Sequence, residues 1–183
     1  AMLQEQCADA IAKGAQIVEE IAKSGTNVIG LPDRQMRQLR GNDVAMIFQE
    51  PMSCLNPAFS IGEQILETLK IHDCCSKSER IVVVHDLLAK VGMQEPQKIA
   101  REWPHQLSGG MNQRAMIAMA IACSPKLLIA DEPTTALDAT LEAQIVHRLR
   151  QLQDMIHCSI LFVSHHLGLI AELCDNVVVM YAG

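Results

Sequence analysis

The sequence predicts an α/β fold in which a mainly parallel sheet is joined to an α-helical subdomain. Compact apolar runs at 44–48, 127–130 and 159–163 predict buried strands, and polar residues follow each of them. Helical patterns separate the runs. Alternating strands and helices pair in parallel through right-handed crossovers, so the carboxyl ends of the strands are expected at one edge of the sheet.

The first part of the chain predicts one helix and one short strand before the run at 44–48. Residues 3–23 place apolar side chains at steps of three and four, which is typical of an amphipathic helix that Gly25 would end. Residues 26–29 are a candidate strand. The basic and polar stretch 33–43 predicts an exposed helix or turn, with Arg34, Arg37 and Arg40 as a solvated stripe.

A long helical region is expected between the first two strands, after a loop at 52–59. Two capping boxes, Ser60 with Glu63 and Ser76 with Glu79, mark helix starts. Gly92 would end the second of these helices. The expected helices are 61–71, 77–90, a short piece near 96–102, and one that begins after Ser108.

The last part of the chain continues the alternation. A helix is predicted at 140–156, the strand 159–163 follows, and a helix at 167–174 leads to a final strand at 177–181.

Composition narrows the functional class. The 183 residues suffice for one domain with a sizeable core, and the net charge of −6 with 3% aromatic residues argues against a nucleic-acid partner. No apolar run reaches the length of a membrane span. The seven cysteines are scattered and odd in number, and none forms a C-x-x-C pair, which predicts reduced thiols and not a disulfide framework.

An acidic pair directly follows the apolar strand 127–130. Asp131 could hold Mg²⁺ through oxygen ligands, and Glu132 could orient a water for attack on a phosphate. A solvated acidic turn explains such a pair equally well when it stands alone.

A glycine loop opens the helix that precedes this strand. Ser108, Gly109 and Gly110 would expose backbone N–H groups at the positive end of the helix dipole, where an anion binds. An ordinary capped helix start is the alternative. The following Gln113-Arg114, the helix and the acidic strand favour the functional interpretation.

Two further polar residues end strands. Gln49 follows the run at 44–48 and could ligate a metal ion or a water through its amide. His165 follows the run at 159–163 and could donate a hydrogen bond to a phosphate. In isolation, each is explained as well by a structural role.

Taken together, these motifs resemble the nucleotide-binding subunits of ATP-binding cassette (ABC) transporters. LSGGM at 107–111 is similar to the family signature, LLIADEP at 127–133 to the Walker B strand, and ALD at 136–138 to the D-loop. Gln49 matches the Q-loop and His165 the switch histidine. FQEPMSCLNP at 48–57 resembles the peptide, dipeptide and nickel importer branch. His166 departs from the family, which usually has Asp there.

The resemblance implies ATP and Mg²⁺ as cofactors and roles for the motif residues. Glu132 and His165 would be catalytic, and Asp131 with Gln49 would hold the metal. Nucleotide contacts would come from Gln49, Ser108, Gly109, Gly110 and Asp138. The expected partners are transmembrane permease subunits, a second ATP-binding subunit and, indirectly, a solute-binding protein, which would place the chain in the cytoplasm on the inner face of the membrane.

No G-x-x-x-x-G-K-[ST] phosphate loop (P-loop) occurs in the 183 residues. The chain is therefore expected to be an incomplete P-loop NTPase core, truncated before that loop and inactive in isolation. Its expected parts are an N-terminal helix at 1–25, a RecA-like core at 26–59 and 124–183, and the helical subdomain at 60–123. The alternative is a catalytically dead remnant that acts only as a binding module.

Overall fold

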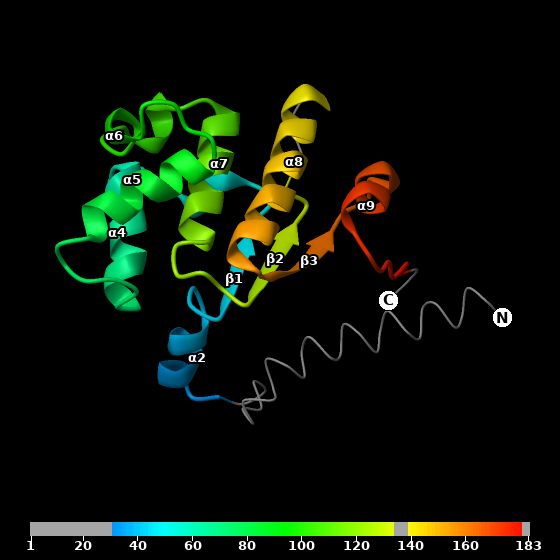
Figure 1. Ribbon diagram of the computed structural model, residues 1–183, viewed down its shortest axis with the longest axis horizontal. Coiled ribbons are helices and arrows are strands. Elements are labelled where there is room, and N and C mark those ends of the chain that lie inside the picture. The colour runs from blue at the N-terminus through cyan, green and yellow to red at the C-terminus, as the bar shows by residue number, and fades with distance from the viewer. Residues whose placement is uncertain (1–30, 134–138, 181–183) are drawn as a thin grey trace.

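The computed structural model describes residues 31–133 and 139–180 (Figure 1). Three strands form one parallel sheet in the order β1-β2-β3, with β2 (Leu127–Asp131) between β1 (Val44–Ile47) and β3 (Ser159–Val163). The prediction of an α/β fold with a parallel sheet is confirmed. The expected N-terminal helix and the strand at 26–29 lie outside the described residues.

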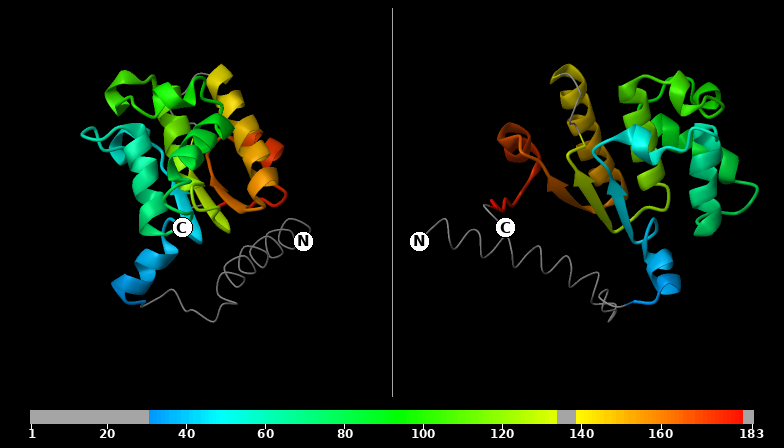
Figure 2. Two further views of the ribbon diagram at one scale, coloured as in Figure 1. Left: turned by 60° about the vertical axis from the view of Figure 1, so that its left-hand side comes forward. Right: turned by 180° about the vertical axis from the view of Figure 1, so that it is seen from behind.

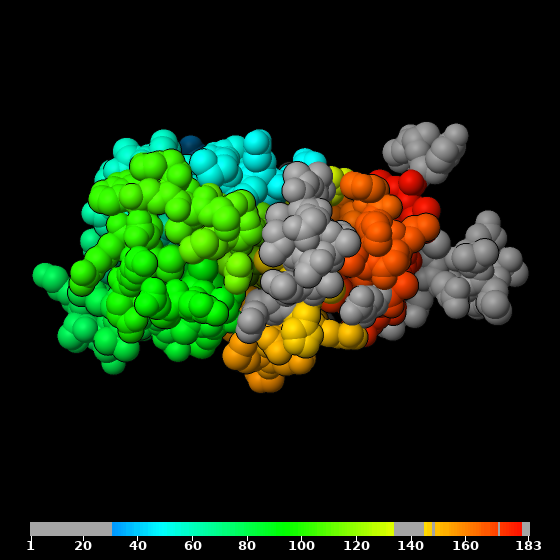
Figure 3. All heavy atoms as spheres, turned by 90° about the horizontal axis from the view of Figure 1, so that it is seen from above, coloured from blue at the N-terminus to red at the C-terminus, as the bar shows by residue number. Residues whose placement is uncertain are grey.

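Most helices of the described chain lie between β1 and β2. They are α3 (Pro51–Cys54), α4 (Ile61–Ile71), α5 (Arg80–Lys90), α6 (Pro96–Ile99) and α7 (Gly109–Ala120). In addition, α2 (Asp33–Leu39) precedes β1, α8 (Ala139–Ile156) joins β2 to β3, and α9 (Leu167–Leu173) follows β3. Figures 1 and 2 show α4 to α7 gathered at one end of the molecule and α9 at the other end, beyond β3. The view from above shows the same division (Figure 3).

One face of the sheet contributes to the hydrophobic core. The register aligns Ile47 with Ala130 and Ala130 with Phe162, so every second residue of each strand points to this face. Ile47 and Ala130 are fully buried there. The same buried cluster includes Ile117 of α7 and Leu149 of α8, so the sheet and both helices share one core.

The start of α4 confirms one predicted capping box. The Ser60 hydroxyl accepts from the Glu63 backbone N–H at 3.3 Å, and the Glu63 carboxylate accepts from the Ser60 N–H at 2.8 Å. The Ser60 hydroxyl also donates to the Glu63 carboxylate at 2.8 Å, and the bonds from the Ser60 backbone N–H and hydroxyl lower the pKa of Glu63 below its usual value. The helix therefore begins at Ile61 as predicted.

The second capping box does not start a helix at 77. Ser76 does hydrogen-bond to the Glu79 carboxylate, but α5 begins at Arg80 and its N-cap, Glu79, makes no side-chain capping bond. The Ser76–Glu79 pair stabilises a turn before the helix instead. The reciprocal capping bond is missing, because the Glu79 N–H donates to the Ser76 backbone carbonyl at 3.0 Å and not to the Ser76 hydroxyl. The local pattern could not distinguish these outcomes because both place Ser76 next to the Glu79 carboxylate.

Two expected elements are corrected. Residues 52–54 belong to α3 and not to a loop, because Pro51 at the first helical position starts a short helix. Residues 177–180 form no strand, and Val179 is 73% exposed. Within the described sheet, β3 has only β2 as a neighbour, so this apolar run pairs with no strand there.

The prediction that all cysteines are reduced thiols is wrong at two positions. Cys74 and Cys123 form a disulfide across a sequence separation of 49, with their Cα atoms 5.7 Å apart. Cys74 follows α4 and Cys123 follows α7, and the packing of these helices brings the two ends together. Cysteine spacing could not reveal this pair because the proximity is created by tertiary packing.

Among the other described cysteines, Cys54, Cys75, Cys158 and Cys174 are free. Burial raises the pKa of the Cys158 thiol and, together with the charge of Asp175, that of Cys174. Both thiols are therefore kept in the neutral form, which is a poor nucleophile.

None of the helices in residues 31–133 and 139–180 is long and apolar enough to cross a membrane.

We expect Ser60→Ala to lower the free energy of unfolding by about 1 kcal/mol because α4 loses its N-cap. Glu63 has a lowered pKa in the folded state, so its stabilising effect is present above the ordinary carboxyl pKa and is lost as pH falls through the lowered value. The difference between wild type and variant should therefore shrink in acid. Urea unfolding of both proteins at several pH values measures this difference in the free energy of unfolding. Ser76→Ala, at an exposed turn, is the control, and an equal loss there would contradict the capping argument.

Reduction of the Cys74–Cys123 disulfide should lower the free energy of unfolding by roughly 2–4 kcal/mol, because the open chain regains the entropy of a long loop. Thermal melting with and without a thiol reductant measures this. The Cys74→Ser variant should melt at the temperature of the reduced wild type, and the reductant should not change its Tm. In the Cys54→Ser variant, which keeps the disulfide, the reductant should lower the Tm as in the wild type. A Cys74→Ser variant that still responds would contradict the pairing.

Candidate functional site

The predicted polar residues meet at the carboxyl-terminal edge of the sheet. Gln49 lies just beyond β1, Glu132 directly follows β2, and His165 lies just beyond β3. The strands are parallel and in register, with Ile47 opposite Ala130 and Asp131 opposite Val163. All three strands therefore end at nearly the same level, and their polar ends converge.

Glu132 is the centre of this group. Its Oε2 accepts a hydrogen bond from Nε2 of Gln49 at 2.9 Å, and its Oε1 lies 2.9 Å from Nδ1 of His165. An ionised carboxylate can only accept, so the amide nitrogen of Gln49 faces Glu132 and Nδ1 of His165 carries the proton. The Glu132 side chain is 28% exposed and that of His165 is 75% exposed, so the group opens to solvent on the histidine side.

The backbone at Glu132 leaves the strand conformation. Its φ is 43°, in the left-handed region that a residue with a Cβ rarely adopts, and its N–H donates to the Val163 carbonyl at 2.9 Å. Such a conformation costs on the order of 1–3 kcal/mol and persists only where the surroundings hold it. Here it turns the carboxylate out of the sheet and toward Gln49 and His165.

Asp131 is the last residue of β2 and follows the strand alternation. It belongs to the same face as Ile129, opposite the core face that carries Leu128 and Ala130. Its carboxylate and the amide of Gln49 thus come from neighbouring strand ends.

These two residues fit Mg²⁺ as partial ligands. Because Gln49 directs its nitrogen to Glu132, its amide oxygen remains for a cation, and the Asp131 carboxylate is a hard oxygen ligand. In the described part of the chain, no cluster of three or more His, Cys, Asp or Glu side chains could hold a metal ion. Mg²⁺ commonly takes one or two protein ligands and completes its shell with waters and phosphate oxygens, so the residues present suit a metal that arrives with a phosphate.

The loop at 107–111, which we call the glycine loop, starts α7. Ser108 is the N-cap, and its hydroxyl accepts from the Met111 N–H at 3.4 Å. Ser108 and Gly109 are exposed, and a Cβ built on Gly109 would meet no atom within 4 Å. Gly109 therefore faces open space, whereas Gly110 is buried. In residues 31–133 and 139–180, Ser108 makes no hydrogen bond to Gln49, Glu132 or His165, and Asp138 lies outside the described residues.

In the sequence, Gln113 only supported the glycine-loop motif, but in the structure it also reaches this site. It is 2% exposed on α7, and its Nε2 donates to the Pro133 carbonyl at 2.6 Å, next to Glu132. The adjacent Asn112 is equally buried and donates to the Pro104 carbonyl at 3.0 Å. The available signal was a pair of amides, followed by Arg114, at the start of a mainly apolar helix, because buried amides need specific partners.

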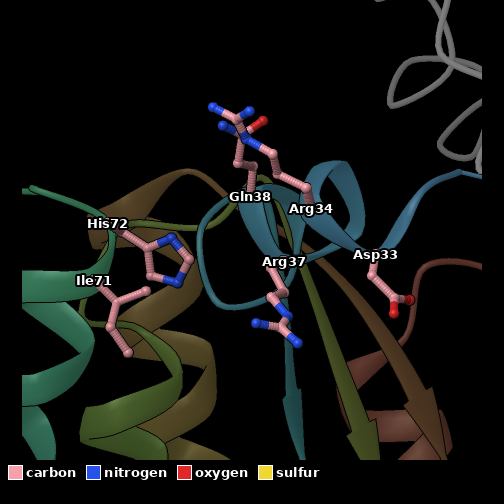
Figure 4. Close-up of a pocket in the computed structure, with 6 residues that line it drawn as sticks. All are labelled: Asp33, Arg34, Arg37, Gln38, Ile71 and His72. Atoms are coloured by element: carbon pink, nitrogen blue, oxygen red, sulfur yellow. The ribbon is translucent and has the colours of Figure 1, made fainter.

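A separate cleft of about 440 Å³ lies between α2 and the end of α4, where Figure 4 shows its lining side chains. The lining residues are Asp33, Arg34, Arg37, Gln38, Ile71 and His72. It includes two arginines of the predicted basic stripe. Because α2 leads into the amino end of β1, this cleft lies at the opposite edge of the sheet from Glu132.

Comparison with known proteins matches residues 9–135 to the family described as ABC transporter. The chain is 49% identical over 164 residues to a probable peptide ABC transporter ATP-binding protein of Sinorhizobium fredii, covering 90% of this chain and 49% of the relative. A putative peptide import ATP-binding protein of Brucella ovis is 51% identical over 163 residues, covering 88% of this chain and 48% of the relative. The chain thus spans about half the length of these relatives.

A glutathione import ATP-binding protein of Escherichia coli K12 is 52% identical over 149 residues, which are 81% of this chain and 24% of that protein. Among solved structures, the ATP-binding cassette MJ0796, dimeric in a post-hydrolysis state with ADP and Pi, aligns with a TM-score of 0.66 at 28% identity. The alignment covers 76% of this chain and 60% of that one. The family resemblance of the motifs is therefore confirmed, and the chain belongs to the ABC transporter family.

Proposed function

We propose that this chain is part of an ATP-binding subunit of an importer, which couples ATP hydrolysis to the uptake of peptides or similar small solutes. The observation that carries the proposal is the convergence of Gln49, Glu132 and His165 at one sheet edge, with both carboxylate oxygens of Glu132 held at 2.9 Å. The names of the peptide and glutathione import relatives support the solute class.

In this proposal, Glu132 accepts a proton from the water that attacks the γ-phosphate. His165 holds the carboxylate in position by donating from Nδ1. Only in its doubly protonated form would its Nε2–H also donate to the reacting phosphate. Asp131 and Gln49 would bind Mg²⁺, which neutralises phosphate charge when it is bound. Since Gln49 donates to Glu132 and lies two residues before α3, it also links this chemistry to the part of the chain that follows β1.

The glycine loop has a different proposed role. Ser108, Gly109 and Gly110 would bind phosphate on a second ATP-binding subunit, together with Asp138. The exposure of Ser108 and Gly109 and the open space at Gly109 support a contact made across an interface. The division into an N-terminal helix, a RecA-like core and a helical subdomain, which would dock on a permease at the inner face of the cell membrane, remains part of this proposal.

A second candidate is a binding module without hydrolysis of its own. The lack of a G-x-x-x-x-G-K-[ST] motif among the 183 residues favours it for the isolated polypeptide, because that motif supplies the N–H cradle and the lysine for the phosphates. ATP hydrolysis that appears only with a second ATP-binding subunit, and that Ser108→Ala abolishes, would show that this chain contributes its glycine loop to a shared active site. A pure binding module would show no such activity.

Glu132→Gln should lower kcat for ATP hydrolysis by roughly 10²–10⁴-fold, because a general base contributes a factor of that order. The affinity for ATP should remain unchanged. The value of kcat is measured as the steady-state rate of phosphate release. The sample is the protein that the natural gene encodes, purified together with its permease. The matched control is Glu67→Gln on the exposed face of α4, which should be silent. Unaltered hydrolysis in Glu132→Gln would refute the proposed role.

The 183-residue chain by itself should bind Mg-ATP more weakly than the micromolar range. The physical reason is that Asp131, Gln49 and His165 contact only the edge of a triphosphate and its metal. Isothermal titration calorimetry of the purified chain tests this directly. Saturable binding with a micromolar Kd would contradict this prediction, because it would mean that other residues of the chain bind the phosphates.

A further inference from the structure

We infer that Gln113 is a positioning residue for Glu132, and that it connects the glycine loop to the proposed water-activating carboxylate within one chain. The catalytic part of this inference rests on the proposed role of Glu132, whereas the structural part does not. The contact involved is the 2.6 Å hydrogen bond from Nε2 of Gln113 to the Pro133 carbonyl.

The burial of Gln113 requires a specific partner. With only 2% of its surface exposed, its amide has lost its hydrogen bonds to water, and an unpaired amide in such a place is strongly unfavourable. Pro133 is buried as well and has no N–H, so its carbonyl is its only backbone polar group. The two groups therefore satisfy each other.

This bond is one of two hydrogen bonds that hold the backbone on either side of Glu132. On one side, the Glu132 N–H is bound by the Val163 carbonyl of β3. On the other side, the Pro133 carbonyl is bound by Gln113 of α7. Glu132, with its φ of 43°, lies between these attachments. Without the α7 attachment, the backbone could relax toward an ordinary conformation, and the carboxylate would turn away from Gln49 and His165.

The same helix begins with the glycine loop. Ser108 caps α7, and Gln113 lies in the next turn of the helix, so the two belong to one rigid element. Arg114 strengthens this turn by donating from Nε to the Gly110 carbonyl at 3.1 Å and from Nη1 to the Gly92 carbonyl at 3.2 Å. A displacement of the loop by a partner's phosphate would therefore move Gln113, and with it the carbonyl that follows Glu132.

The test uses Gln113→Met, which keeps the length of the side chain and removes the donor. In the ¹⁵N-labelled 183-residue chain, hydrogen exchange of the Glu132 amide should be roughly tenfold faster, as expected for the loss of one hydrogen bond. At about pH 9, above the ordinary titration range of histidine, long-range ¹H–¹⁵N spectra should show His165 shifting from the Nδ1–H tautomer toward the Nε2–H tautomer. Glu132→Ala is the reference for a fully lost contact.

The matched control is Gln64→Met in α4. Gln64 is also buried, at 5% exposure, and its Nε2 donates to the Asn56 and Phe59 carbonyls, away from Glu132. It should destabilise the chain without changing the His165 tautomer. Gln113→Leu is a second variant, because its apolar side chain cannot donate to Pro133. A folded Gln113 variant with wild-type Glu132 exchange and His165 tautomer would overturn the inference.

Measurements of ATP hydrolysis distinguish this inference from the proposed function. In the protein expressed from its own gene with its permease, Gln113→Met should lower kcat roughly tenfold with an unchanged KM for ATP, which corresponds to a loss confined to the transition state. If Glu132→Gln leaves hydrolysis intact, the proposed function fails, but the exchange and tautomer results still decide whether Gln113 positions Glu132. If Glu132→Gln abolishes hydrolysis and Gln113→Met changes neither kcat nor the spectra, only the inference fails.

Discussion

Parallel pairing of three strands is the constraint on which the candidate site depends. Gln49 and Glu132 are 83 positions apart, and Glu132 and His165 are 33 positions apart, yet all follow strands that end at one edge. The register makes these ends level, and the turn at Glu132 then directs the carboxylate between its two neighbours. A slip of one residue in β2 would exchange the two faces of the strand and separate the three side chains.

Helix α7 joins the site to the core and to the surface. Its apolar side chains, such as Ile117, are fully buried in the cluster that also includes residues of β1 and α8. Its buried amides, Asn112 and Gln113, hold the chain before the glycine loop and the chain after Glu132. Buried amides add little net stability compared with apolar side chains, but their N–H donors select one geometry because any other leaves these donors unpaired. The helix therefore presents the exposed Ser108 and Gly109 from a firmly positioned base.

The helical region between β1 and β2 is further restrained by covalent and capping interactions. The Cys74–Cys123 disulfide links the ends of α4 and α7, and the Ser60–Glu63 box fixes the start of α4. Gln64 then binds carbonyls of the loop that follows α3. Motion of this region relative to the sheet is thus expected to occur as a unit, with Gln49 at its junction with β1.

The sequence by itself determined the three strands of the described sheet, most helix starts and the order of the polar strand ends, because these depend on local periodicity and capping. It also determined that Gln49, Glu132 and His165 would share an edge, since parallel strands leave no other arrangement. Tertiary structure alone decided the Cys74–Cys123 bond, the turn conformation at Glu132 and the partner of Gln113. Each of these depends on contacts between segments distant in sequence, whose distances no local pattern encodes.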